Sequence, residues 1–239
     1  MSRAFAWAVH AYTASGQLVA AWMAVCIVEG GDAGFRRAMQ LMALATFIDS
    51  TDGWLARRAR VKEALPGFDG RRLDDIIDFQ TYTALPLLLL WRAGIPSAGW
   101  AWVLPFAAVA SLYGFSQTNA KTEDGYFLGF PSYWNVVAVY LYLLRPHDAL
   151  AAASIGLLAL LTFVPTRYLY PSHQGGWFAA ITNLGAAVWG VLLGAILTGA
   201  ASERWTLLSA AYPAYYLLAS WWVELRFRSR RARTESALH

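Results

Sequence analysis

The chain has 239 residues, of which 58% are hydrophobic and 14% are charged, with a net charge of +4 and a mean hydropathy of +0.39. Because a soluble domain carries about 25% charged residues, this composition excludes an ordinary soluble domain and predicts an integral membrane protein. The single cysteine, Cys26, excludes an intrachain disulfide and a cysteine-based zinc cluster.

Eight apolar stretches are each near the length of about 20 residues that a helix needs to cross a bilayer. The connections between them are short and rich in Gly, Pro and charged residues. The first stretch is expected to be a retained helix, since no small-residue cleavage site follows it. The fold is therefore expected to be all-α, a single-domain membrane bundle of about eight transmembrane helices over residues 1–239. The expected spans are 5–28, 36–57, 73–93, 98–118, 128–145, 148–169, 177–199 and 204–226.

Basic residues set the expected orientation of these spans. One basic cluster lies between the second and third spans, at 57–72, and another lies in the tail at 226–239. The positive-inside rule places both on the cytoplasmic side, and eight spans make these assignments compatible. The 119–127 and 167–176 loops then lie on the same side of the membrane as the 57–72 loop.

Four aspartates stand at the neighbouring ends of the second and third spans. Asp49 and Asp52 are spaced i, i+3, and Asp74 and Asp78 are spaced i, i+4, so each pair shares one helix face. A carboxylate near a bilayer centre costs about 2.5 kcal/mol or more, and a divalent cation would offset that cost. Carboxylates suit Mg2+ or Mn2+, and two ions about 3.5–4 Å apart can clamp a phosphoryl displacement. Asp75 points about 100° away from Asp74 and is left outside this metal site.

Small and basic residues around the aspartates suit a diphosphate ligand. The guanidinium fork of Arg57 matches phosphate oxygens. Gly53 and Ala56 would let a flat ligand approach the backbone, and Gly67 and Gly70 would let the loop fold tightly over it. The arginines after Arg57 are explained more simply as a positive-inside loop.

These residues form a longer pattern, Asp49-x-x-Asp52-Gly53-x-x-Ala56-Arg57 followed by Gly70-x-x-x-Asp74-x-x-x-Asp78. The pattern resembles the signature of the CDP-alcohol phosphatidyltransferase family, and every signature position is filled. The resemblance implies a membrane enzyme that uses two Mn2+ or Mg2+ ions to displace CMP from a CDP-linked donor with an alcohol. It implies that Asp49, Asp52, Asp74 and Asp78 bind metal and that Asp78 takes the proton from the alcohol. The CDP site is expected to comprise Asp49, Asp52, Gly53, Ala56, Arg57, Gly67 and Gly70.

Further stretches resemble a narrower group of this family, the bacterial phosphatidylcholine synthases. They include His10-x-x-Thr13-Ala14-Ser15-Gly16, Lys121-Thr122-Glu123-Asp124 and Gly129-Phe130-Pro131-x-x-Trp134-Asn135, whereas Ser50, Trp54 and Asp75 depart from that group's pattern. This resemblance implies CDP-diacylglycerol as donor, choline as acceptor and CMP as product. It also implies a multi-pass protein among the lipids of the bacterial inner membrane, with its active site on the cytoplasmic side. A homodimer is compatible with it, and no nucleic acid partner is expected.

A choline acceptor would need aromatic faces and carboxylates, because its quaternary ammonium has no hydrogen to donate. Tyr82 lies one turn after Asp78, and the 119–134 region supplies acidic and aromatic residues together. The candidates are Tyr82, Glu123, Asp124, Tyr126, Phe130, Trp134 and Asn135. Aromatic residues at a membrane interface are, however, also common as belt residues.

Two alternatives remain open at this point. The same chemistry with serine, inositol or glycerol phosphate as acceptor is the first, although an acidic acceptor would favour extra Arg or Lys in the 119–134 region. The second is a membrane transporter, which would spread its carboxylates near mid-span and often carry an internal repeat. Here the carboxylates cluster at one interface beside a basic loop.

Overall fold

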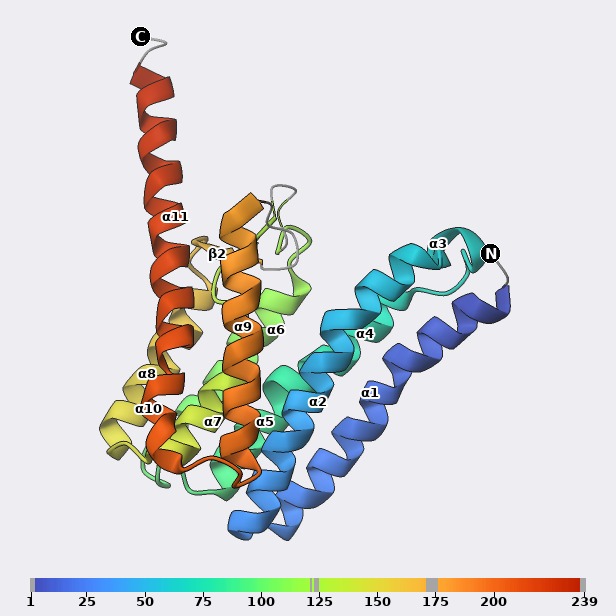
Figure 1. The fold of residues 1–239 in the computed structure, drawn as a ribbon. Helices are drawn as coiled ribbons and strands as arrows, with labels where there is room; N and C mark the ends of the chain where they lie inside the picture. The colour runs from blue at the N-terminus through green and yellow to red at the C-terminus, as the bar shows by residue number, and fades with distance from the viewer. Residues whose placement is uncertain (1–2, 121, 123–124, 171–175, 237–239) are drawn as a thin grey trace. The chain divides into compact units, whose positions relative to one another are not determined.

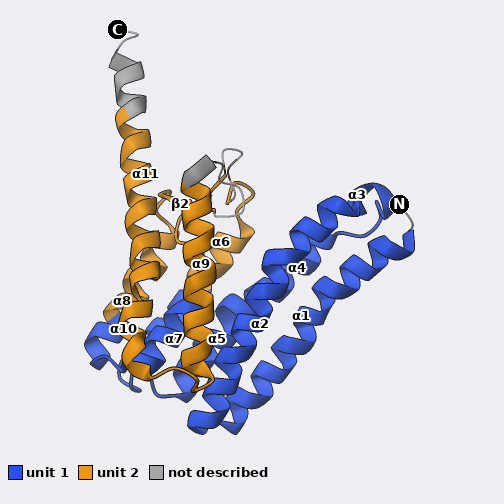
Figure 2. Ribbon diagram, in the orientation of Figure 1, with its two compact units in different colours: residues 1–108, 133–152 blue, residues 109–132, 153–239 orange. Residues whose placement is uncertain are grey.

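The computed structural model describes residues 3–120, 122, 125–170 and 176–236, and most of them are helical (Figure 1). The elements fall into two compact units (Figure 2). One unit comprises residues 1–108 and 133–152, and the other comprises residues 109–132 and 153–239. Each unit is therefore assembled from two separate stretches of the chain. The expectation of a mainly α-helical fold is confirmed, with the addition of two short strands.

The first unit begins with a helical hairpin made of α1 (Arg3–Glu29) and α2 (Gly31–Arg58), which lie side by side (Figure 1). Gly30 and Gly31 join the two helices with φ values of 71° and 69°, a conformation that glycine adopts without steric cost. Gly34 approaches α1 so closely that a Cβ atom there would lie 2.7 Å from the carbonyl oxygen of Cys26. Small residues therefore let the two helices pack tightly where they join.

The second half of this unit is a continuous helical segment over residues 70–92. It consists of α4 (Gly70–Asp78), a π-helix η1 (Phe79–Ala84) and α5 (Leu85–Arg92), and Asp69 caps its start by accepting a hydrogen bond from the Arg72 amide at 3.0 Å. A π-helix widens the turn and is rare except at functional sites. Here it begins at the residue that follows Asp78. The short helix α3 (Val61–Ala64) lies in the connection from α2.

Helix α7 (Trp134–Leu144) packs against α5 and η1 and completes the core of the first unit. Trp134 is fully buried, and the Asn135 amide donates a hydrogen bond to the Thr46 hydroxyl of α2 at 3.1 Å. At the other end of α7, the Tyr142 hydroxyl donates to Asp32 at 2.7 Å. Polar contacts therefore connect α7 to the start and to the middle of the long helix α2.

The predicted spans coincide with helices, but several bounds are wrong. Helix α6 (Val103–Ser116) starts later than the expected 98, and α8 (Asp148–Thr162) ends well before the expected 169. The predicted span 128–145 begins with an irregular segment, because α7 starts at Trp134. The predicted span 204–226 comprises η3 (Glu203–Trp205), α10 (Thr206–Ser209) and α11 (Ala211–Ser236), which continues ten residues beyond the predicted end. Among the described residues, two helices are long and apolar enough to cross a membrane, namely α1 and the 178–197 part of α9 (Gly176–Leu197), and α6, α7 and α8 are shorter apolar helices. The number of about eight spans stays a prediction.

The second unit contains an antiparallel pair of strands, β1 (Tyr126–Leu128) and β2 (Arg167–Leu169), with Phe127 opposite Tyr168. Helix α11 hydrogen-bonds to β2 through side chains spaced four residues apart. The Tyr216 hydroxyl donates to the Leu169 carbonyl at 2.9 Å, and the Ser220 hydroxyl accepts from the Leu169 amide at 3.1 Å.

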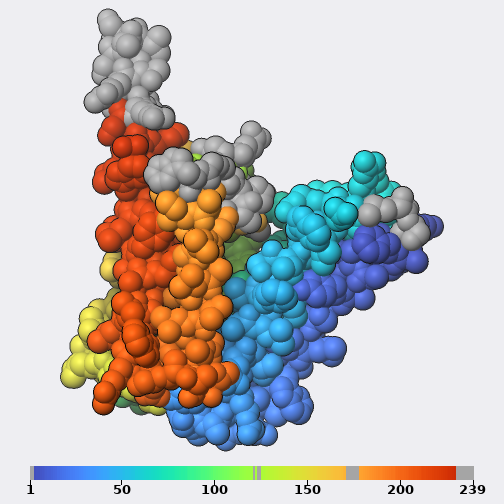
Figure 3. Space-filling model, in the orientation of Figure 1, coloured from blue at the N-terminus to red at the C-terminus, as the bar shows by residue number. Residues whose placement is uncertain are grey.

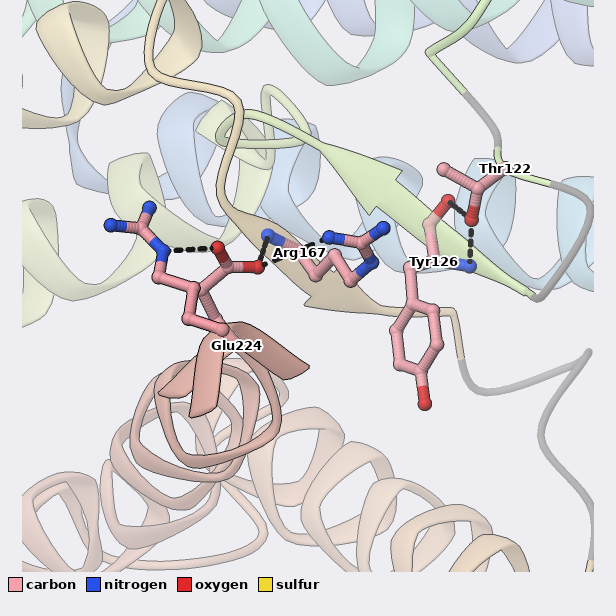
Figure 4. Close-up of polar contacts among 5 residues, drawn as sticks. Thr122, Tyr126, Arg167 and Glu224 are labelled. Carbon is pink, nitrogen blue, oxygen red and sulfur yellow. Dashed lines mark hydrogen bonds and ion pairs between the residues drawn. The ribbon is translucent and has the colours of Figure 1, made fainter. Parts of the chain in front are cut away.

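Glu224 continues this row and is buried (Figure 4). Its carboxylate accepts from the Arg167 amide at 3.1 Å and from the Arg228 guanidinium at 2.6 Å. The Arg167 guanidinium lies 3.6 Å from the same carboxylate and 3.4 Å from the centre of the Phe227 ring. A stripe of α11 side chains therefore satisfies backbone groups of β2 that a further strand would otherwise bind.

Helix α9 also packs against α11, through a close approach at Gly185, where a Cβ atom would lie 2.9 Å from the Tyr212 ring. Helix α9 also has apolar side chains that are exposed, and it is visible along much of its length in Figure 3. Ile181, Leu184, Val188 and Val191 are each more than half exposed. An exposed apolar face of this kind suits contact with lipid chains.

We expect Glu224→Ala to destabilise the second unit by about 1.5–3 kcal/mol, because hydrogen bonds to a charged group contribute that much. Denaturant unfolding in detergent would measure the loss, and hydrogen exchange would show faster exchange at the Arg167 amide. Glu63→Ala is the matched control, because Glu63 is exposed and lies 3.9 Å from Arg60 in a surface ion pair. Equal effects of the two substitutions would contradict a role for Glu224 in holding the strand.

Candidate active site

Three of the four motif aspartates come together in the first unit. Asp49 projects from α2, and Asp74 and Asp78 project from successive turns of α4. One carboxylate oxygen from each lies within 4.8 Å of the others, and all three residues are half-buried. Like charges at this separation repel each other in a partly dehydrated site, and oxygen donors so grouped fit a hard divalent cation. The predicted pairing of Asp74 and Asp78 on one helix face is confirmed.

Asp52 lies beside this cluster and is turned toward α1. It is 6% exposed, and it accepts a hydrogen bond from the Thr13 hydroxyl at 2.8 Å. Its carboxyl group also interacts with the carboxyl groups of Asp49 and Asp74. The four aspartates are therefore neighbours, but the three-carboxylate group is formed without Asp52, and binding of metal by Asp52 stays a prediction.

Tyr82 reaches the aspartates from the π-helix. Its hydroxyl donates a hydrogen bond to the Asp49 carboxylate at 2.7 Å, and its side chain also interacts with Asp78 and Thr46. Its ring lies 6.1 Å from that of Tyr133. The sequence placed Tyr82 near Asp78 as a choline contact, and the structure places it there, but with its hydroxyl engaged by Asp49. Contact of the ring with an acceptor stays a prediction.

Sequence reasoning missed the roles of Thr13 and Thr46, two hydroxyl residues that support the site. Thr13 binds Asp52 directly, and Thr46 links Asn135 of α7 to the region of Tyr82. Nothing local in the sequence marks them, since their partners lie 39 and 89 residues away. Asn135, predicted as an acceptor contact, has its amide nitrogen bonded to Thr46 and its amide oxygen bonded to the Val136 backbone amide.

The predicted CDP-site residues occupy the end of α2 and the start of α4. Gly53 and Ala56 are half-buried, and Arg57 is exposed at the last turn of α2. Gly67 is exposed with open space around it, and its φ is not positive, so the loop conformation does not require glycine there. Gly70, by contrast, lies against the His10 ring. Their binding of CDP stays a prediction.

The remaining acceptor candidates are distributed over both units. Tyr126 and Phe130 lie in the second unit, and Trp134 lies in the first. Phe130 is 5% exposed and packs against Tyr168 with ring centres 6.3 Å apart, and Trp134 is fully buried. Glu123 and Asp124 lie outside the described residues. The Tyr126 amide donates to the Thr122 hydroxyl at 3.0 Å (Figure 4).

The grouped aspartates of this helical chain are those of the sequence pattern that resembles the CDP-alcohol phosphatidyltransferases. No family model matches the chain. The chain is 38% identical over 172 residues to a phosphatidylcholine synthase of Pseudomonas aeruginosa, and this alignment covers 72% of the chain and 71% of the relative. It is 33% identical over 228 residues to a phosphatidylcholine synthase of Legionella pneumophila, and this alignment covers 91% of the chain and 88% of the relative. It is 32% identical over 215 residues to a phosphatidylcholine synthase of Rhizobium meliloti, and this alignment covers 89% of the chain and 87% of the relative. The chain belongs to the bacterial phosphatidylcholine synthase family.

We expect Tyr82→Phe to weaken divalent-metal binding about 10- to 100-fold, the usual effect of removing a partner that orients a metal ligand. The substitution leaves the ring in place and removes the hydroxyl that holds Asp49. Titration of purified protein with Mn2+, followed by electron paramagnetic resonance, would measure the change. Tyr12→Phe is the matched control, because the Tyr12 hydroxyl bonds Thr51 at 2.7 Å and not an aspartate. Unchanged Mn2+ affinity in Tyr82→Phe would contradict this role.

Proposed function

We propose that the chain transfers the phosphatidyl group of CDP-diacylglycerol to choline and releases CMP. The observation that carries the proposal is the group of Asp49, Asp74 and Asp78 within 4.8 Å in a chain of the phosphatidylcholine synthase family. These aspartates support a CDP-linked donor and metal-dependent phosphoryl transfer more directly than they support choline as the acceptor.

Asp49, Asp74 and Asp78 would hold a divalent cation, with Asp52 available to hold a second one. Mn2+ or Mg2+ bound there would neutralise the donor diphosphate and polarise its phosphorus. Thr13 and Tyr82 hold two of the four carboxylates in fixed orientations before any ligand arrives. These hydrogen bonds restrict the motion of the Asp52 and Asp49 carboxylates and so reduce the reorganisation that metal binding requires.

Asp78 is the residue we assign as general base. It lies at the end of α4, where the chain enters the π-helix, and its carboxylate would accept the proton of the choline hydroxyl. The choline oxygen then forms a bond to the phosphorus next to diacylglycerol, and the bond from this phosphorus to the CMP oxygen breaks. General-base assistance of this kind contributes about 10²–10⁴-fold to the rate.

The donor would lie over the end of α2 with its acyl chains in the bilayer. Arg57 is exposed at that end and its fork would bind phosphate oxygens. Gly53, Ala56 and Gly67 offer no bulky side chain between the ligand and the backbone, whereas the Cβ side of Gly70, the remaining predicted CDP-site residue, faces the His10 ring. These residues surround the aspartates in the sequence pattern, which supports a common ligand.

Choline as acceptor is supported by the family and by the aromatic and acidic character of the 119–134 region. Tyr82 and Tyr126 are the candidates for cation–π contact, with Glu123 and Asp124 as candidate carboxylates. The remaining candidates, Phe130, Trp134 and Asn135, are buried.

We further propose that the chain spans the bacterial inner membrane about eight times, with the aspartates on the cytoplasmic side. Two long apolar helices, three shorter ones and the open apolar face of α9 support this placement. The basic loop at 57–72 supports the orientation by the positive-inside rule.

An assay of the purified protein tests the proposal directly. With CDP-diacylglycerol and Mn2+ or Mg2+, CMP release should require choline and should not occur with serine, inositol or glycerol phosphate. Release with one of these alcohols but not with choline would overturn the assignment of the acceptor.

Asp78→Asn should lower turnover at least about 100-fold while the protein still folds, because the amide cannot accept the proton. Asp75→Asn is the matched control, since Asp75 lies outside the carboxylate group, 3.9 Å from Arg71. We expect turnover of this control to remain within about threefold of wild type, as for a surface substitution. Wild-type turnover of Asp78→Asn would contradict its role as base.

Removal of divalent metal by a chelator should abolish CMP release, and adding Mn2+ or Mg2+ should restore it. The physical reason is that the diphosphate would otherwise approach three uncompensated carboxylates. Activity that persists after complete chelation, with metal content checked by mass spectrometry, would contradict metal dependence.

A further inference from the structure

The first residue of α4, Gly70, lies in direct contact with a side chain of α1. A Cβ atom at Gly70 would lie 2.5 Å from Cε1 and 3.0 Å from Nδ1 of His10. Real Cβ atoms are essentially never found closer than 3.0 Å to another heavy atom. The φ of Gly70 is not positive, so its backbone conformation is open to other residues. The His10 ring, and not the backbone, is therefore what requires glycine at this position.

The His10 ring is buried and packs against two other aromatic rings. His10 is 5% exposed, and its ring centre lies 4.6 Å from that of Phe68 and 6.0 Å from that of Trp7. Trp7 and Phe68 in turn lie 5.2 Å apart, so the three rings form a cluster that connects α1 to the loop before α4. The Nε2 atom of His10 has no hydrogen-bond partner among the described residues. Packing therefore holds the ring in place.

Two further positions on α1 contact the helices that carry the aspartates. A Cβ atom at Gly16 would lie 2.9 Å from Ile77 of α4, and the Thr13 hydroxyl binds Asp52 of α2. His10, Thr13 and Gly16 follow each other at a spacing of three residues, so they lie along one side of the helix. Helix α1 thus contacts α4 near its start and near its end.

We propose that His10 is a positioning residue that fixes the Gly70 end of α4 and thereby aligns Asp74 and Asp78 with Asp49. Its ring fills the space that a side chain at residue 70 would occupy, so the small residue and the large ring act as a complementary pair. The inference rests on the proposed function only for the roles of the three aspartates.

The test is a double-mutant cycle on the full-length protein with the variants His10→Ala, Gly70→Ala and His10→Ala/Gly70→Ala. Three quantities are measured for each variant: the unfolding temperature without metal, the affinity for Mn2+, and transfer to choline. Gly99→Ala is the control for added volume, because no atom lies within 4 Å of a Cβ atom built at Gly99.

Gly70→Ala should weaken Mn2+ binding at least about tenfold, as expected when metal ligands lose their alignment, and it should lower the unfolding temperature. His10→Ala/Gly70→Ala should recover at least about fivefold of the lost affinity, since residues in contact show coupling of this size. Gly99→Ala should leave all three quantities unchanged. If Gly70→Ala does not fold, recovery of folded protein in the double variant supports the proposal equally.

Two results would overturn the inference. A double variant no better than Gly70→Ala would mean that glycine is required for a ligand approaching the backbone and not for the His10 ring. Wild-type behaviour of Gly70→Ala would mean that the contact is not restrictive. Failure of the proposed function has a different signature, because wild-type protein would then not transfer to choline while the unfolding and Mn2+ measurements still report the coupling of His10 and Gly70.

Discussion

The structure of the first unit depends on holding three carboxylates together against their mutual repulsion. One carboxylate oxygen from each of Asp49, Asp74 and Asp78 lies within 4.8 Å of the others, and the three residues are half-buried. Charges in such a partly buried site interact more strongly than in water. Hydrogen bonds and helix packing must supply the restraint until a cation arrives. Tyr82 supplies it at Asp49, and the rigid turn of α4 supplies it for the other two. A site organised in this way is suited to a cation and poorly suited to remaining empty.

The π-helix η1 is the segment that connects α4, which carries Asp74 and Asp78, to the apolar helix α5. It occupies residues 79–84, between the last aspartate and the leucine-rich α5. Its wider turn changes the angular position of every side chain after Asp78. Thr81, Tyr82 and Thr83 fall in this turn. The Tyr82 hydroxyl hydrogen-bonds to Asp49, and the Thr81 and Thr83 side chains are buried.

Local periodicity explains how much of the site could be predicted from the sequence. The spacing of Asp74 and Asp78 determines their common face, because both belong to one short helix. The same reasoning about Asp49 and Asp52 was less complete, since Asp52 turns toward Thr13 of another helix. That contact depends on the packing angle of α1 against α2, which spacing within α2 does not encode. The hydrogen bond from the Tyr82 hydroxyl to Asp49 likewise joins two helical segments, η1 and α2, and spacing within either segment does not encode it.

Hydropathy predicted where helices lie but not where they stop. The predicted span 148–169 is mostly apolar, yet the helix ends at Thr162, shortly before Pro165, and residues 167–169 form a strand. Short apolar runs suit either structure. The strand is stabilised by α11, whose Ser220 and Glu224 side chains hydrogen-bond to the strand backbone. Such a partner is about fifty residues away, so a window along the sequence cannot detect it.

Burial narrows the choice of residues that recognise the acceptor. Phe130 and Trp134 are enclosed within their units, and Tyr82 is 9% exposed with its hydroxyl bound to Asp49. Tyr126 remains half-exposed on β1, and three hydrogen bonds join its backbone to Thr122, at 2.8, 3.0 and 3.2 Å. Because β1 pairs with β2, and β2 is bound by Glu224, this tyrosine has a restrained backbone and a partly exposed side chain. An aromatic residue restrained in this way loses little entropy on binding a cation, which makes Tyr126 the strongest of the described aromatic candidates.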